Sequence, residues 1–196
     1  MVAKRRAEMV EETRAKLIGA ARKAFATKGY AAASMDELTA EVGLTRGALY
    51  HNFGDKKGLL QAVIDEIDAE MLVRQRRAGA QATSPWAAFV QEGIAYIEMS
   101  LEPEIQRIML LDGPSVLGDP SRWPNQTACL RTTTQTIQAL IDEGTMKPMD
   151  AEAAARLING AALNAALWIA AADDPHAVLG KAVEAFRNLA TGLLKS

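Results

Sequence analysis

The chain has one cysteine, Cys129, and two histidines, His51 and His176, among its 196 residues. A single cysteine excludes an internal disulfide and a cysteine zinc site. Its simplest interpretation is a small buried apolar residue, with a ligand-facing or redox-active thiol as the alternative. The sequence also lacks a glycine-rich phosphate loop, a G-x-S-x-G turn, an H-E-x-x-H pair and an EF-hand loop. We therefore expect neither an enzyme nor a cofactor or metal site.

Long apolar runs are absent as well. The longest stretch without a charged residue covers residues 157–172 and contains Asn159 and Asn164. It is shorter than the roughly 20 apolar residues that span a bilayer. The first residues are basic and are followed by further charges, so no signal peptide is predicted. We expect a cytoplasmic protein without a membrane span.

Aromatic residues make up only 5 % of the chain, and alanine is abundant, a composition that favours helix over strand. The hydrophobic periodicity predicts an all-α chain of about nine helices. The proline- and glycine-rich segment 114–125 is expected to be a loop. The expected helices cover approximately residues 11–28, 34–42, 45–53, 55–73, 84–101, 104–111, 125–143, 150–172 and 174–194.

The net charge of −2 conceals an asymmetry along the chain. Residues 1–60 contain 11 Lys/Arg and 7 Asp/Glu, a net charge of +4, whereas residues 61–196 contain 11 and 17, a net charge of −6. A basic head on an acidic body is typical of a protein that contacts a polyanion with one end. Lys4, Arg5 and Arg6 could form an arm that touches DNA, or a plain flexible terminus.

Two short helices joined by a glycine are the most informative feature of the chain. Ser34, with Glu37 three residues later, forms a capping box that begins the first of them. Gly43 permits a tight turn after it, and Thr45 can cap the second. Supported by a longer first helix, this pattern predicts a helix-turn-helix over about residues 34–53.

The second helix of such a motif enters the major groove of DNA, where its first residues meet base edges. Arg46 can donate two hydrogen bonds to guanine, and Gly47 leaves room for close approach. Side chains one turn later more often bind phosphates, and Lys56 adds its charge to the amino-terminal end of the next helix. As alternatives to contacts with DNA, Tyr50 could be a half-buried aromatic residue and His51 an ordinary surface histidine. The predicted DNA-contacting residues are Ser34, Thr45, Arg46, Gly47, Tyr50, His51, Asn52 and Lys56.

The first 60 or so residues resemble the TetR family of bacterial transcriptional regulators. In that family, positions matching Tyr50 and Lys56 hold phosphates, and those matching Arg46, Gly47 and His51 lie at or near bases. Thr39 departs from the family pattern, which usually has alanine there, and we expect its hydroxyl to bond a backbone carbonyl. The resemblance runs through Phe25, Gly29, Tyr30, Ser34, Met35, Leu38, Val42, Gly43, Leu44, Leu49, Tyr50, Phe53, Lys56 and Leu59.

The remaining part of the chain resembles the family only in its order of helices. The resemblance implies a DNA-binding domain at residues 1–57 and a ligand-binding and dimerisation domain at 58–196. The last two helices are rich in small residues and could form a four-helix bundle in a homodimer, or pack only within one subunit. The predicted dimer interface comprises Leu157, Ala161, Ala165, Val178, Phe186, Leu189 and Leu193.

Apolar side chains with a few polar groups in helices five to eight suit a small hydrophobic or aromatic effector, although such a stripe is also compatible with plain core. The expected function is repression of a palindromic operator in double-stranded DNA, relieved by the effector. Activation, ligand-independent repression, a non-specific architectural DNA-binding protein and a helical enzyme are alternatives. The predicted effector-binding residues are Phe89, Tyr96, Met99, Ile105, Met109, Trp123, Cys129, Asn164 and Trp168.

Overall fold

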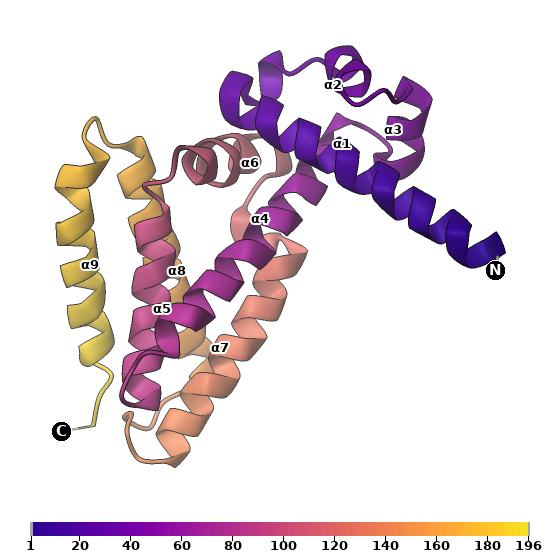
Figure 1. Cartoon of the computed structure of the whole chain (residues 1–196). Coiled ribbons are helices and arrows are strands. Elements are labelled where there is room, and N and C mark those ends of the chain that lie inside the picture. Colours follow the sequence, from indigo (N-terminus) through magenta and orange to yellow (C-terminus); the bar gives the residue numbers. More distant parts are fainter. Residues whose placement is uncertain (1, 196) are drawn as a thin grey trace. The chain divides into compact units, whose positions relative to one another are not determined.

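The structure is a computed structural model that describes residues 2–195, with side chains from residue 8 onwards. Over this range it has nine α-helices, one π-helix and one 3₁₀-helix, and its β-structure is limited to an isolated bridge between Met146 and Leu194. The all-α prediction is therefore confirmed (Figure 1). The elements are α1 (Val2–Ala32), α2 (Met35–Glu41), α3 (Arg46–Phe53), α4 (Lys56–Gly79), α5 (Pro85–Met99), η1 (Ile105–Asp112), α6 (Gly113–Leu117), η2 (Pro120–Arg122), α7 (Pro124–Asp142), α8 (Ala151–Ala171) and α9 (Pro175–Thr191).

The helices divide into two compact units. The first contains the described residues up to Ile67 together with Arg107–Gly118, and the second contains Asp68–Gln106 and the described residues from Asp119 onwards. The division falls inside α4, whereas the sequence placed the domain boundary at residue 57. The first half of α4 belongs to the first unit, and its second half belongs to the second.

Side-chain caps begin most of the helices where the sequence predicted them. The oxygens of Ser34, Thr45 and Ser84 accept hydrogen bonds from the N–H groups three residues later. The carboxylates of Asp150 and Asp174 do the same for α8 and α9. These bonds satisfy N–H groups that the first turn of a helix leaves unpaired. They therefore explain why the predicted starts are correct.

The region between α5 and α7 differs from the expectation. In place of the helix expected at residues 104–111, the structure has the π-helix η1 at Ile105–Asp112, and the predicted loop at 114–125 contains most of α6 and all of η2. Pro114 and Pro120 were interpreted as helix breakers, yet each lies in the first turn of its helix, where a proline needs no N–H partner. The helical content of this region was therefore underestimated.

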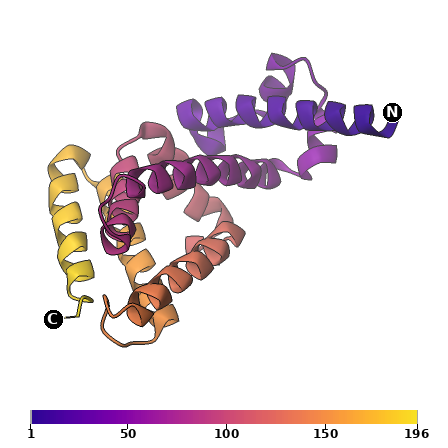
Figure 2. The same ribbon diagram turned by 60° about the horizontal axis from the view of Figure 1, so that its bottom comes forward.

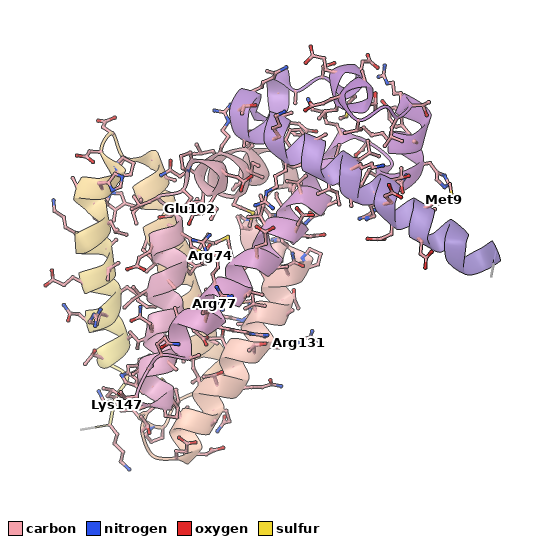
Figure 3. All side chains as sticks on the ribbon, in the orientation of Figure 1. Met9, Arg74, Arg77, Glu102, Arg131 and Lys147 are labelled. Carbon is pink, nitrogen blue, oxygen red and sulfur yellow. The ribbon has the colours of Figure 1, made fainter. Side chains whose placement is uncertain are left out.

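The two ends of the chain also differ from the expectation. Helix α1 starts at Val2, nine residues before the expected start at residue 11. The backbone of Lys4, Arg5 and Arg6 belongs to α1, and their side chains lie outside the described residues. Helix α9 ends at Thr191 rather than near residue 194, because the last residues form the β-bridge. Figure 3 shows Lys147 beside this end of the chain.

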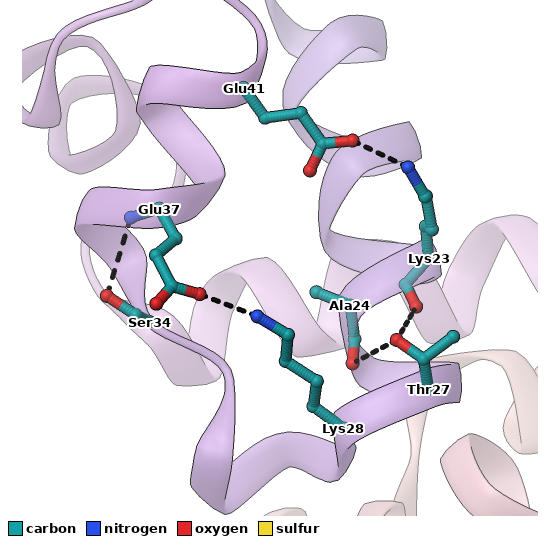
Figure 4. Close-up of polar contacts among 7 residues, drawn as sticks. All are labelled: Lys23, Ala24, Thr27, Lys28, Ser34, Glu37 and Glu41. Atoms are coloured by element: carbon teal, nitrogen blue, oxygen red, sulfur yellow. Dashed lines mark hydrogen bonds and ion pairs between the residues drawn. The ribbon is translucent and has the colours of Figure 1, made fainter.

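The first unit has a core made of one face from each of its main helices. Phe25 of α1, Leu38 of α2 and Leu49 of α3 are buried there. Two ion pairs on the surface join α1 to α2, with Nζ–Oε distances of 2.7 Å for Lys28–Glu37 and 2.8 Å for Lys23–Glu41 (Figure 4). Exposed pairs contribute little, so the core holds α3 in place. The other buried apolar residues are Leu17, Ile18, Ala20, Ala21, Ala33, Leu59, Leu60, Ala62, Val63, Ile64, Ile67, Ile108, Met109 and Leu110.

The second unit is built around α8, which packs against α5, α7 and α9 (Figures 1 and 2). One core cluster joins α5, α8 and α9, and a second joins α7 to the first turns of α8. Gly93 of α5 allows α9 to approach closely, because an added Cβ would lie 2.6 Å from Cζ of Phe186. Arg74 of α4 donates two hydrogen bonds to Glu102 in the turn after α5 (Figure 3).

Candidate nucleic-acid interface

Helix α3 buries one side and exposes the other. Leu49 is fully buried, whereas Thr45, Arg46 and Gly47 are exposed together with Tyr50 and His51 one turn later. The periodicity of 3.6 residues places these residues away from Leu49. The predicted DNA-contacting residues on α3 therefore project outward, except for Asn52, whose side chain is turned back onto its own helix.

The contacts of Asn52 explain this exception. Its Nδ2 donates to the carbonyl of Ala48 at 2.8 Å, and its own carbonyl accepts a hydrogen bond from Nη1 of Arg14 at 3.2 Å. The guanidinium of Arg14 also lies 4.6 Å from the ring centroid of Phe53. A cation is favourable at a helix carboxyl terminus. Arg14 and Asn52 therefore fix the end of α3, and the amide of Asn52 is engaged within its own helix.

Arg46 is held by two neighbours. Its Nη1 donates to the Asp36 carboxylate, at 3.3 Å from Oδ1 and 3.4 Å from Oδ2, and its Nη2 lies 3.3 Å from the hydroxyl of Tyr50. The guanidinium carbon is 5.6 Å from the Tyr50 ring centroid. The hydrogen bond with Tyr50 and then the charge of Asp36 raise the pKa of Arg46. The guanidinium therefore stays charged, and a guanidinium has five N–H donors.

The residues around Arg46 leave space for a partner molecule. An added Cβ at Gly47 would meet only the Oγ1 of Thr45, at 3.7 Å. The side chain of Tyr50 is 43 % exposed, so the half-buried alternative does not remove its hydroxyl from the surface. Ser34 is partly buried, and its oxygen accepts the N–H of Glu37. A hydroxyl also has a donor hydrogen, so Ser34 can still bond a phosphate.

Lys56 is more constrained than the sequence indicated. Its Nζ donates to the carbonyl of Ala31 at 3.3 Å and lies 4.6 Å from the ring centroid of Tyr30. Burial lowers the pKa of this lysine. The carboxylate of Asp55 accepts the N–H of Gly58 at 2.7 Å and therefore occupies part of the helix terminus that was predicted to attract a phosphate.

The predicted effector-binding residues differ in burial and in the unit to which they belong. Asn164 and Trp168 are exposed on α8, with Trp168 50 % exposed, so they do not line the interior of this subunit. Met109 belongs to the first unit, and the other members belong to the second. Trp123 is buried, and its Nε1 has no hydrogen-bond partner among the described residues. The remaining members, which are buried or partly buried, are Phe89, Tyr96, Met99, Ile105 and Cys129.

Cys129 lies in a small polar cluster inside the second unit. The amide Nδ2 of Asn159 is 3.9 Å from Sγ of Cys129 and 3.3 Å from Oγ1 of Thr133. Burial raises the pKa of the Cys129 thiol, and the hydrogen bond with Thr133 only partly opposes this. The neutral thiol is a poor nucleophile. Cys129 therefore contributes a weakly polar contact to this cluster.

The predicted dimer residues also divide. Leu157 is 75 % and Leu189 60 % exposed, whereas Phe186 is only 3 % exposed and packs in the subunit's own core. Phe186 cannot face a partner, so its place in the predicted interface is corrected. The partly buried members of the predicted dimer interface are Ala161, Ala165, Val178 and Leu193.

Helix α8 is long and apolar enough to cross a membrane when only its length and composition are considered. In this structure, 33 % of its apolar stretch is buried inside the subunit.

Comparison with known proteins identifies the family. Residues 17–63 match the family described as "Bacterial regulatory proteins, tetR family". Residues 86–193, more than half of the chain, match "Tetracyclin repressor-like, C-terminal domain". The chain belongs to the TetR family. It is a DNA-binding transcriptional regulator, and the resemblance that the sequence analysis found in the first 60 or so residues extends into the second unit.

Individual TetR-family proteins agree over different lengths. The crystal structure of a TetR-family regulator from Pectobacterium atrosepticum is 48 % identical, with a TM-score of 0.87, and the match covers 96 % of this chain and 97 % of that one. The Tn10 TetC protein of Escherichia coli is 28 % identical over 78 % of both chains. TtgR of Pseudomonas putida is 39 % identical over 33 % of this chain and 30 % of its own.

A more distant structure shares the fold alone. RolR in complex with resorcinol is 21 % identical, with a TM-score of 0.66, over 97 % of this chain and 98 % of its own.

Sequence reasoning missed Arg14 and Asp36, whose side chains contact α3, the second helix of the helix-turn-helix and therefore its recognition helix. Arg14 is 38 positions from its partner Asn52, and Asp36 is 10 positions from Arg46. Both contacts depend on how the helices pack, which periodicity does not reveal. Asp36 was interpreted only as part of a capping box, and its acidic charge next to a basic edge was the available signal.

Proposed function

We propose that the chain is a cytoplasmic homodimeric repressor that holds a palindromic operator and releases it when a small hydrophobic or aromatic effector binds. The observation that carries the proposal is the exposed edge of α3, where Thr45, Arg46, Gly47, Tyr50 and His51 project on the side opposite the buried Leu49. A helix edge with cationic and hydroxyl donors fits the major groove and its flanking phosphates.

The residues of this edge have different proposed roles. Arg46 reads a guanine, because its fork of donors matches the O6 and N7 acceptors. Tyr50 and Lys56 bind phosphates and therefore fix the position of the helix without reading sequence. Lys56 is proposed to bind the DNA backbone from the start of α4, where its Nζ lies 4.6 Å from the ring centroid of Tyr30.

The test begins with selection of bound duplexes from a random pool. Lys56→Ala is then expected to weaken binding to all duplexes alike, whereas Arg46→Ala changes the preference at one base position in each half-site. The exposed neighbour Lys57, changed to alanine, is the matched control for the loss of one positive charge. An unchanged base preference in Arg46→Ala would reject its role as a base reader.

Dimerisation is proposed through α8 and α9. Leu157, Trp168 and Leu189 are large apolar side chains exposed on these helices, and burying them against a second copy would be favourable by about 25 cal/mol per Å². Two copies are required to place two recognition helices about 34–36 Å apart on a palindrome.

Sedimentation measurements can test this interface. Leu157→Glu and Leu189→Glu are expected to yield monomers that bind a single half-site weakly. Val73→Glu, at an exposed apolar position on α4, is the matched control and should remain dimeric. Wild-type protein that sediments as a monomer at the concentrations used for DNA binding would reject the dimer.

The proposed effector site lies in the second unit, around Tyr96, Trp123 and Cys129. The buried Nε1 of Trp123 has no partner among the described residues, and a buried donor without an acceptor is costly. An effector with an acceptor oxygen on an apolar or aromatic body would satisfy it. RolR, which has the same fold, binds the diphenol resorcinol, and this supports phenolic compounds as the first class to screen.

A thermal-shift screen of such compounds tests the effector proposal. A ligand at 100 times its Kd is expected to stabilise the folded state by about 2.7 kcal/mol. Trp123→Phe keeps an aromatic ring and removes the N–H, so it should reduce the response to the ligand while leaving operator binding intact. Compounds that stabilise the protein but leave the operator complex unchanged would point to ligand-independent repression.

A further inference from the structure

Asp36 is the acidic residue of α2 that pairs with the recognition helix. Its two carboxylate oxygens accept from Nη1 of Arg46 at 3.3 and 3.4 Å. The other acids of α2 pair with α1 instead, Glu37 with Lys28 and Glu41 with Lys23 (Figure 4). One carboxylate is therefore directed at the side chain that is proposed to read DNA.

Fold stability does not explain this pair. The side chains of Arg46 and Asp36 are 55 % and 72 % exposed, and exposed ion pairs contribute little. A carboxylate beside the DNA-facing edge also repels phosphates and weakens general affinity for DNA. Any exposed acid of α2 would repel phosphates in this way, so an effect that is specific to Asp36 is expected through Arg46.

We propose that Asp36 is a positioning residue that directs Arg46 to a base edge instead of a phosphate. This inference rests on the proposed role of Arg46 as a base reader. A guanidinium whose charge is partly balanced by a carboxylate is attracted less strongly to an anionic phosphate. It keeps its ability to donate to O6 and N7 of guanine, because these acceptors are neutral.

The geometry around Arg46 supports this role. The carboxylate of Asp36 accepts from Nη1, and the hydroxyl of Tyr50 accepts from Nη2. These hydrogen bonds, two to Asp36 and one to Tyr50, occupy at most three of the five N–H donors, which leaves at least two for DNA. Holding the long side chain in one orientation before binding also reduces the entropy lost on binding. Asp36 and Tyr50 together therefore hold Arg46 in place and leave donors for a base.

The test compares Asp36→Ala with Glu37→Ala. Each variant removes one acid from the first turn of α2, and only the first releases Arg46. Two quantities are measured with the operator obtained by selection. They are the slope of log Kobs against log salt concentration, and the relative affinity for duplexes substituted at each position of the half-site.

In Asp36→Ala, Arg46 is expected to turn to a phosphate. The salt slope should become steeper than in Glu37→Ala by about 0.9 for each half-site. The preference for guanine at one position should fall by about fivefold or more. In the Arg46→Ala background, Asp36→Ala should change neither quantity beyond the effect of Glu37→Ala, because the residue acts through Arg46.

Two results would overturn the proposal, and a third would overturn the role of Arg46 on which it rests. Identical salt slopes and base preferences in Asp36→Ala and Glu37→Ala would mean that Asp36 affects binding only through its negative charge. A changed preference that persists in the Arg46→Ala background would make Asp36 itself the base reader. If Arg46→Ala alone leaves base preference intact, the proposed role of Arg46 fails instead. Asp36→Asn keeps the size of the side chain and is used if the alanine variant unfolds, with the same outcomes.

Discussion

The carboxylate of Asp112 accepts a hydrogen bond from the backbone N–H of Tyr30 at 2.7 Å, although the residues are 82 positions apart. Asp112 also accepts from Nε of Arg107 at 3.3 Å. The guanidinium of Arg107 in turn lies over Gly29, where an added Cβ would be 2.0 Å from its Nη2. These contacts hold the segment Arg107–Gly118 on the end of α1 within the first unit.

Asp112→Ala should loosen this attachment. The side chain is only 18 % exposed, so its removal leaves the N–H of Tyr30 without a charged acceptor, at a cost of about 1–3 kcal/mol. Urea unfolding and hydrogen exchange of the Tyr30 amide measure the effect, and the exposed Asp173, changed to alanine, is the control. Unchanged exchange at Tyr30 in the variant would show that the bond contributes nothing.

Gly29→Ala is expected to destabilise the first unit. Gly29 has φ 79° and ψ 163°, a region that is almost restricted to glycine, so alanine should cost about 1–3 kcal/mol. The clash with the flexible end of Arg107 adds less, because that side chain can move. Gly19 is a matched control with the opposite sign. It lies in the helical part of α1 with nothing within 4 Å of an added Cβ, so Gly19→Ala should stabilise by about 0.5–1 kcal/mol. Thermal unfolding of both variants tests the pair.

Local chemistry explains what the sequence predicted correctly. The caps at Ser34, Thr45 and Asp150 depend on a side chain and an N–H three residues apart, so they can be recognised without the fold. The predicted hydroxyl bond of Thr39 is confirmed for the same reason, since its Oγ1 donates to the carbonyl of Met35 at 3.0 Å. The outward edge of α3 likewise follows from periodicity around the buried Leu49.

The errors concern contacts between distant segments. Phe186 was assigned to the dimer interface as a large apolar residue on a helix rich in small residues, yet Gly93 on α5 opens a space that its ring fills. Trp168 was assigned to the effector site as a large aromatic, but it lies on the exposed side of α8. Periodicity identifies apolar faces and does not say which neighbour covers each one.

The contact between Gly93 and Phe186 leads to a packing prediction. In Gly93→Ala the methyl group would lie 2.6 and 2.7 Å from two ring carbons of Phe186, and such overpacking typically costs about 1–3 kcal/mol. Phe186→Leu removes the ring edge, so the double variant should be more stable than the sum of the single effects. Gly180→Ala, where an added Cβ meets nothing within 4 Å, is the control. If the changes in the free energy of unfolding for Gly93→Ala and Phe186→Leu simply add in the double variant, the ring of Phe186 does not limit the size of the residue at position 93.

The burial of Glu92 leads to a prediction of how the free energy of unfolding changes with pH. Burial raises the pKa of Glu92 above its ordinary value, and the positive charge of Arg76 only partly opposes this. The folded state therefore holds the proton more tightly than the unfolded state, so stability falls as the pH rises from the ordinary value of about 4.3 through the raised pKa. Glu92→Gln cannot ionise and should escape this loss.

The free energies of unfolding of wild type and Glu92→Gln should therefore differ least below about pH 4 and most at neutral pH, with the variant more stable. Urea unfolding at several pH values between these limits measures the difference. Glu98→Gln, at an exposed position on the same helix α5, corrects for the loss of one negative charge. A pH-independent difference between Glu92→Gln and Glu98→Gln would mean that burial of the carboxylate does not influence folding. A difference that reverses sign at neutral pH would mean that Arg76 outweighs burial and that the ionised carboxylate is stabilising.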